Sequence, residues 1–235
     1  MAFLFYHIEF MIVVQSLVME LRAGSHVVPI LHDITFEIPQ KQVVSIVGPS
    51  GSGKSTLLGL LAGLDKPTRG SITIHGTDIT ALTETEMVHH RREHIGYIFQ
   101  SFHLIPTLTA LENVALPLEL NGDPGAMSRA KELLQAVGLE DRQDHYPVQL
   151  SGGEQQRVAV ARAFSTKPPV LLADEPTGNL DSATGELVID LLFRLNHDHG
   201  STMVLVTHDQ SLATRTERII ALRDGEVASD TPMIS

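Results

Sequence analysis

The chain has 235 residues, of which 43% are hydrophobic, so it is long enough to bury a core in one large domain. Its 17 basic and 28 acidic residues give a net charge of −11, which argues against non-specific binding to nucleic acid or anionic lipid. It contains no cysteine, which excludes disulfides and thiolate chemistry, and no apolar run approaches the roughly 20 residues of a membrane span. Any transport role therefore requires a membrane part from another chain.

The first ten residues are apolar, lack a basic segment and include Glu9, so we interpret residues 1–10 as an N-terminal extension and not as a signal peptide. A membrane anchor is the less favoured alternative because the segment is short. Residues 11–235 then form one domain, and Met11 is an alternative start of the protein.

Short apolar runs recur along the chain and predict strands. Several are continuously apolar, which is typical of strands buried on both faces of a parallel sheet. The runs are residues 11–15, 43–47, 71–74, 95–99, 170–173, 202–206 and 218–222. The last run precedes Asp224 and Gly225, a dipeptide typical of a hairpin turn. Between roughly residues 85 and 149 helical patterns replace the strand signal, which predicts a helical insertion, about residues 86–150, in an α/β core.

A glycine-rich loop joins the run 43–47 to a leucine-rich helix predicted over residues 55–62. Lys54 is expected to reach the β- and γ-phosphates of a nucleotide, and the Ser55 hydroxyl to bind Mg²⁺. The alternative, a glycine-rich turn with a solvated lysine, is disfavoured by the strand–loop–helix context. The loop fits the Gly-x-x-x-x-Gly-Lys-Ser pattern, whose backbone N–H groups surround phosphates, and with the residue after it comprises Gly48, Pro49, Ser50, Gly51, Ser52, Gly53, Lys54, Ser55 and Thr56.

Two adjacent carboxylates, Asp174 and Glu175, end the run 170–173. At the end of a strand both side chains can turn toward a ligand crevice. Asp174 suits the Mg²⁺ shell, through water, and Glu175 suits a general base for an attacking water. The alternative is a solvated junction before Pro176.

Two further polar residues follow predicted strands of the same sheet. Gln100 comes after the run 95–99, and its amide is a candidate to bind Mg²⁺ or to hydrogen-bond to the attacking water. His208 comes after the run 202–206 and is a candidate contact of the γ-phosphate.

A second phosphate-binding turn is predicted at Ser151, Gly152, Gly153 and Glu154, which precede a helix over residues 155–164. Ser-x-x-Glu is also a capping box for that helix, and both functions are compatible. Two successive glycines exceed what capping needs, and N–H groups at a helix N-terminus attract anions. One ATP needs only one phosphate-binding loop, so a second phosphate-binding turn indicates that the nucleotide is bound between two copies of the protein.

Two pairs of histidines are not predicted to bind metal, because no third ligand or cysteine accompanies them at a suitable spacing. We expect the first pair on a solvated helix face beside two arginines, and the second pair at a helix end. The pairs are His89 with His90, and His197 with His199.

Together these segments resemble the ATP-binding subunit of an ABC transporter over residues 11–228. In that family's terms, residues 48–55 are similar to the Walker A loop, Gln100 to the Q-loop, 150–155 to the signature motif, 170–175 to Walker B, 179–181 with Asp181 to the D-loop, and His208 to the switch histidine. Residues 100–114, 150–159 and 173–181 more narrowly resemble the branch that includes lipoprotein-releasing and macrolide-exporting ATPases. Within it, the resemblance is greatest to the related predicted export subunits.

The resemblance implies a P-loop NTPase (RecA-like) α/β core with an antiparallel β subdomain and a helical subdomain specific to the family. It implies an ATPase with ATP and Mg²⁺ as cofactors, and a head-to-tail homodimer in which each ATP lies between the Walker A loop of one copy and the signature motif of the other. Gln100 and the helical insertion would contact a membrane permease, at the cytoplasmic face of the bacterial inner membrane. The subunit would power export or extraction of a substrate, with no nucleic-acid partner.

Two other functions are less well supported by the sequence. A soluble ATPase of this type acting on nucleic acid or the ribosome would be expected to carry a long coiled-coil insertion, a tandem ATPase domain or a basic surface. A non-enzymatic binding module would be expected to have lost its catalytic positions, yet Lys54, Asp174, Glu175 and His208 are all present.

One position departs from the family's usual pattern. Members usually place an aromatic residue, which stacks on adenine, about ten residues before the segment 31–33, and here Leu21 stands there. Such stacking contributes about 0.5–1.5 kcal/mol beyond burial. Our hypothesis is that ATP affinity and discrimination between bases are reduced, with phosphate chemistry intact.

Overall fold

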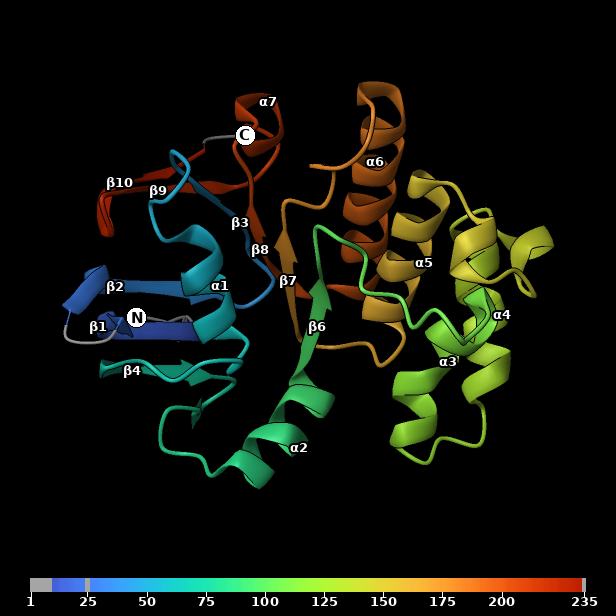
Figure 1. The fold of residues 1–235 in the computed structure, drawn as a ribbon, viewed down its shortest axis with the longest axis horizontal. Helices are drawn as coiled ribbons and strands as arrows, with labels where there is room; N and C mark the ends of the chain where they lie inside the picture. The colour runs from blue at the N-terminus through green and yellow to red at the C-terminus, as the bar shows by residue number, and fades with distance from the viewer. Residues whose placement is uncertain (1–9, 24–25, 234–235) are drawn as a thin grey trace, which may run out of the picture.

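A computed structural model describes residues 10–23 and 26–233, which form two sheets with helices between and beside them (Figure 1). The central sheet has the order β10-β9-β3-β8-β7-β6, and its neighbouring strands are parallel except in the edge hairpin of β9 and β10. Its strands are β3 (Val43–Val47), β6 (Ile95–Ile98), β7 (Val170–Asp174), β8 (Thr202–Val206), β9 (Arg218–Arg223) and β10 (Glu226–Pro232). The Asp224–Gly225 turn joins β9 to β10 with positive φ at both residues, which confirms the predicted hairpin.

The second sheet is antiparallel, in the order β2-β1-β4-β5. Its strands are β1 (Phe10–Ala23), β2 (His26–Pro39), β4 (Arg69–Ile74) and β5 (Thr77–Asp78). Strand β2 was not predicted, although Ile34, Phe36 and Ile38 are buried and alternate with exposed residues. Residues 1–9 of the expected N-terminal extension lie outside the described residues, and Phe10 begins β1.

Helix α1 (Lys54–Leu61) lies between the two sheets (Figure 1). Leu57, Leu58, Leu60 and Leu61 are all buried, and they share one core with residues of β1, β2, β3, β4 and β8. A short helix that is apolar on nearly every side is stable only when it is covered from both directions. The two sheets provide this cover, and they fix the start of α1 next to the end of β3.

A second core covers the opposite face of the central sheet and is built mainly of helices (Figure 1). No strand is assigned between residues 99 and 169, all of which are described. The helical elements of this side are α3 (Ala110–Leu120), α4 (Ala126–Ala136), η1 (Glu140–Arg142), η2 (Pro147–Gln149), α5 (Gly152–Phe164) and α6 (Ser182–His199). Strand β6, which lies within the range 86–150 expected for the helical insertion, is hydrogen-bonded to β7 in the central sheet.

Helix α2 (Glu84–His94) precedes β6, and its packing shows that the prediction for His90 was wrong. His90 was expected on a solvated face, but it is buried because it lies on the same side of α2 as Met87, which packs into the core. Its ring stacks on His94 with centroids 4.4 Å apart. Burial lowers the pKa of His90 to about 4, so this side chain is neutral at pH 7.

Short helix α7 (Gln210–Ala213) follows β8. Within the described residues, none of the helices combines the length and apolarity needed to cross a membrane.

Candidate active site

The predicted phosphate loop connects β3 to α1, as expected for a strand–loop–helix unit. Gly53 precedes the helix with φ at 96°, and a Cβ there would lie 2.6 Å from the Leu31 Cδ2 atom. Gly48 is equally constrained, because a Cβ would lie within 2.2 Å of the Leu222 carbonyl oxygen. Glycine is therefore required at both positions by conformation and by space.

Lys54, the first residue of α1, is 7% exposed, and its ammonium group bends back over the loop. Nζ donates to the carbonyl oxygens of Gly48 and Pro49, each at 2.9 Å. An ammonium group has three N–H donors, so one remains for a phosphate oxygen. The two carbonyl bonds fix the direction of that donor.

Ser55 and Asp174 meet across the edge of the central sheet. The Ser55 hydroxyl donates to Asp174 Oδ1 at 3.1 Å. Burial raises the pKa of the Asp174 carboxyl, and the hydrogen bond from Ser55 partly offsets this effect. A hydroxyl and a carboxylate oxygen are hard ligands, so this pair fits the chemistry of Mg²⁺.

Glu175 follows β7 in a left-handed conformation, with φ at 42°, and its N–H donates to the Val206 carbonyl oxygen at 3.0 Å. This conformation turns the carboxylate toward His208, whose Nδ1 lies 3.2 Å from Glu175 Oε2. The amide of Gln100 lies beside them, since a Cβ on Gly178 would come within 2.7 Å of Gln100 Nε2 and 3.3 Å of Glu175 Oε2. The structure thus brings these three predicted side chains together.

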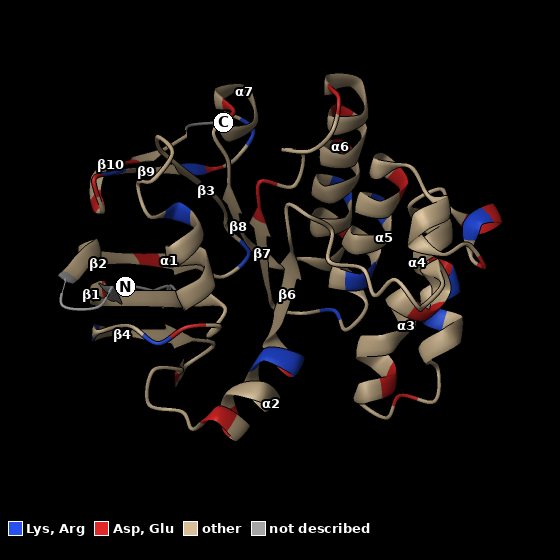
Figure 2. Ribbon diagram, in the orientation of Figure 1, with Lys and Arg blue, Asp and Glu red and all other residues tan. Residues whose placement is uncertain are grey.

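A cavity of about 580 Å³ is lined by nine of the predicted residues and by Ile30. In Figure 2 a basic residue at the start of α1 and acidic residues at the end of β7 lie on the same edge of the central sheet. The cavity is lined by Ile30, Ser50, Gly51, Gly53, Lys54, Ser55, Thr56, Gln100, Glu175 and His208. Ile30 was missed because β2 was not recognised, and the alternation along β2 was the signal that could have found it.

Asp181 lies outside this cavity, although it was predicted to bind nucleotide. It caps α6 by accepting from the Thr184 N–H at 3.1 Å. It lines a neighbouring cavity of about 510 Å³ that also reaches Glu175 and His208. Glu175 and His208 therefore line both the 580 Å³ cavity and the cavity that contains Asp181.

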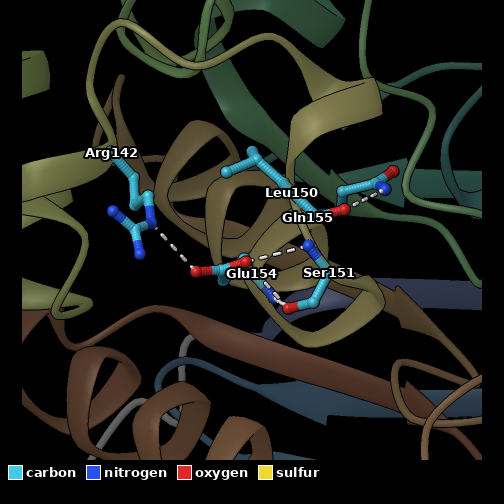
Figure 3. Close-up of polar contacts among 5 residues, drawn as sticks. All are labelled: Arg142, Leu150, Ser151, Glu154 and Gln155. Carbon is cyan, nitrogen blue, oxygen red and sulfur yellow. Dashed lines mark hydrogen bonds and ion pairs between the residues drawn. The ribbon is translucent and has the colours of Figure 1, made fainter.

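The Ser151 turn does not line the 580 Å³ cavity, because it precedes α5, which lies on the opposite side of the central sheet from α1 (Figure 1). The expected capping box is confirmed, and Figure 3 shows its bonds. The Ser151 N–H and hydroxyl donate to Glu154 Oε2 at 2.8 and 2.9 Å, and the Glu154 N–H donates to Ser151 Oγ at 3.3 Å. The N–H groups of Gly152 and Gly153, in the first turn of α5, have no acceptor within the helix.

Comparison with known sequences gives likenesses over most of the chain. The pattern of the family described as "ABC transporter" matches residues 31–178. The ABC transporter ATP-binding protein YbbA of Escherichia coli (strain K12) is 50% identical over 209 residues, which cover 88% of this chain and 92% of that protein. The ABC transporter ATP-binding protein MJ0796 of Methanocaldococcus jannaschii is 49% identical over 224 residues, covering 92% and 95%. The macrolide export ATP-binding/permease protein MacB of Rhodopirellula baltica is 46% identical over 224 residues, covering 94% of this chain and 33% of that longer protein.

Comparison with solved structures gives the same likeness in three dimensions. Two dimeric structures of MJ0796 each superpose with a TM-score of 0.89 at 44% sequence identity, over 96% of this chain and all of the other. One of them is described as a post-hydrolysis state bound to ADP and Pi.

Proposed function

This chain belongs to the ABC transporter family and is the ATP-hydrolysing subunit of an export-type transporter, and we propose that it works as a head-to-tail homodimer with two shared ATP sites. A separate membrane permease would use the work of the dimer to export or extract a substrate. We place the subunit at the cytoplasmic face of the bacterial inner membrane, held there through the permease. The relatives that support this proposal include dimeric cassettes and a protein with ATP-binding and permease parts in one chain.

One observation carries the proposal. Lys54, Ser55, Gln100, Glu175 and His208 surround one cavity, whereas the Ser151 turn lies elsewhere in the same chain. The turn has N–H groups at a helix N-terminus, which suit an anion, but it does not line the cavity of its own copy. A second copy facing the cavity would supply the turn and complete the site around the γ-phosphate.

The side chains of the cavity suit in-line hydrolysis of ATP. The free donor of Lys54 would bind a phosphate oxygen, and Ser55 and Asp174 would hold Mg²⁺, with Gln100 beside them. When bound, Mg²⁺ neutralises charge on the β- and γ-phosphate oxygens. Glu175 would accept a proton from the attacking water while the water oxygen forms a bond to the γ-phosphorus. The bond between the γ-phosphorus and the leaving oxygen of ADP breaks in the same step.

His208 has two functions in this scheme. Its Nδ1 lies 3.2 Å from the Glu175 carboxylate and can orient it. Its side chain is otherwise 70% exposed, so the other ring nitrogen is free for the γ-phosphate.

A separate groove supports a contact with the permease. It has a volume of about 500 Å³ and lies among α2, β6 and α3, where it is lined by apolar residues and by Arg91, Arg92 and Arg162. Arg162, in α5, donates to the carbonyl oxygens of His103 and Phe102 at 2.7 and 2.9 Å. In a chain of net charge −11, an apolar groove bordered by three arginines suits an apolar partner segment that carries a carboxylate.

The shared site predicts a large effect of a negative charge at Gly152. A Cβ there would meet only Leu180 and Phe102 at 3.5 and 3.8 Å, and an acid in the first turn of a helix is compatible with folding. Gly152→Asp should raise the ATP concentration needed for dimerisation of a hydrolysis-deficient Glu175→Gln variant by about thirtyfold, because the new carboxylate would face a phosphate. Light scattering during ATP titration measures this.

The matched control is Thr85→Asp, which adds an acid to the first turn of α2 at an exposed position. It should leave ATP-driven dimerisation unchanged. Unaltered dimerisation of the Gly152→Asp variant would contradict the shared site.

Leu21 bears on how the base is held. It is 49% exposed in β1, opposite Val28, which is 45% exposed. Leu21→Tyr should raise ATP affinity roughly two- to tenfold if an aromatic ring is what the base contact lacks. Equilibrium titration with ATP and GTP measures this, with Leu64→Tyr, another exposed leucine, as control. A variant that gains no affinity for ATP over GTP would contradict the hypothesis.

A further inference from the structure

The turn that would accept the γ-phosphate already contains an anion. Glu154 is the fourth residue of the turn, and its Oε2 accepts two hydrogen bonds from Ser151 (Figure 3). The backbone N–H of Ser151 holds the pKa of the Glu154 carboxyl below its usual value, and the Ser151 hydroxyl and Arg142 act in the same direction. The carboxylate is therefore ionised at neutral pH.

This arrangement creates an electrostatic conflict. The dipole and free N–H groups at the N-terminus of α5 attract an anion. The Glu154 carboxylate, in the first turn of α5, already interacts with this positive end of the helix. A nucleotide presented by a facing copy would bring a second, strongly negative group to the same turn. Like charges brought close in a partly desolvated interface repel each other substantially.

Arg142 is placed to relieve the conflict. Its Nε lies 3.3 Å from Glu154 Oε1, on the carboxylate oxygen that Ser151 does not use (Figure 3). Arg142 belongs to η1 and reaches across from it to α5, so the contact joins two elements. Glu140 and Asp141 precede Arg142 in η1 and line a small cavity with it and Glu154. Arg142 is thus the basic residue that lines this cavity together with three carboxylates.

We propose that Arg142 is a positioning residue for the ATP of the facing copy: it neutralises Glu154 and holds it against Ser151, so that the turn can cap its own helix and still accept a phosphate. This rests on the proposed shared ATP site and names a further residue of it. Without Arg142, the carboxylate would keep its full charge beside the incoming phosphate, and ATP would bridge the two copies less well.

The test is a double-mutant cycle in the Glu175→Gln background, with the ATP concentration for half-maximal dimerisation as the readout. Arg142→Gln should raise that concentration about tenfold. In the presence of Glu154→Gln, which preserves a capping-box side chain, adding Arg142→Gln should change it less than twofold. Arg223→Gln, at an arginine 78% exposed in β9, is the matched control and should have no effect.

Two further readouts separate a charge effect from a structural one. Raising NaCl from 0.1 to 1 M shortens the screening length from about 10 to 3 Å, so the Arg142→Gln defect should shrink. In chains with Glu175 intact, Arg142→Gln should raise KM for MgATP with little change in kcat. A defect that is equally large with Glu154→Gln present, or that is independent of salt, would overturn the proposal.

Failure of this inference is distinguishable from failure of the shared site. If the Glu175→Gln variant dimerises with ATP and Arg142→Gln leaves dimerisation unchanged, only the function given to Arg142 is wrong. If the Glu175→Gln variant does not dimerise with ATP even with Arg142 and Glu154 intact, the shared site and this inference are both wrong.

Discussion

Replacement of Glu175 by glutamine should lower the rate of ATP hydrolysis about a thousandfold while ATP binding is retained. Glutamine has the same shape as glutamate, so it can keep its place 3.2 Å from His208 Nδ1, but it cannot accept a proton from water. Hydrolysis, which would reopen the closed dimer, would then stop. Phosphate release measures turnover, and light scattering with ATP should show a persistent dimer.

The control for Glu175 is a carboxylate of the same kind far from the site. Glu226→Gln lies at the exposed start of β10 and should hydrolyse ATP at the normal rate. Near-normal turnover of the Glu175→Gln variant would remove Glu175 from the proton-transfer step.

Lys54→Ala should weaken ATP binding about a hundredfold, because a charge-assisted bond to a phosphate is lost. The ammonium group is held by Gly48 and Pro49 in a buried position, so neither water nor a neighbouring side chain replaces it easily. Turnover should fall at least as far as binding. Equilibrium binding of ATP, measured with a check on thermal unfolding, tests this.

The exposed Lys131, in α4, provides the comparison: Lys131→Ala removes the same charge from the chain and should leave ATP affinity unchanged. An ATP affinity of the Lys54→Ala variant within about threefold of the unmodified chain would show that this lysine does not bind phosphate.

Strands β3, β7 and β8, inside the central sheet, could be predicted from the sequence because they are buried on both faces. Every residue of Val43–Val47 and Thr202–Val206 is buried, and all but Ser45 and Thr202 are apolar, so both strands were located to the residue. Strand β2 was missed because residues 27–29 near its start are exposed and the prediction relied on continuous apolar runs, whereas the signal in β2 is alternation. His90 was misjudged because the sequence around it is polar, whereas burial depends on which side of α2 meets the core.

Most residues of the cavity were predicted because each follows a strand of the parallel sheet, and the carboxyl ends of such strands meet at one edge. What the sequence could not supply was contact geometry between distant segments. The 3.3 Å approach of Arg142 to Glu154 depends on how η1 packs beside α5, and no local pattern specifies that. The entry of Ile30 into the cavity depends in the same way on the pairing of β2.

Helix α5 has 13 residues and is therefore about 20 Å long. Ser151 caps the N-terminus of α5. Near its C-terminus, Arg162 donates hydrogen bonds to the backbone carbonyl oxygens of Phe102 and His103. A helix held by hydrogen bonds at both ends can move as one rigid unit. If the nucleotide of a facing copy docks at Ser151 as proposed, a tilt of α5 would also move its Arg162 end, and with it the loop that follows Gln100, which is the proposed contact with the permease.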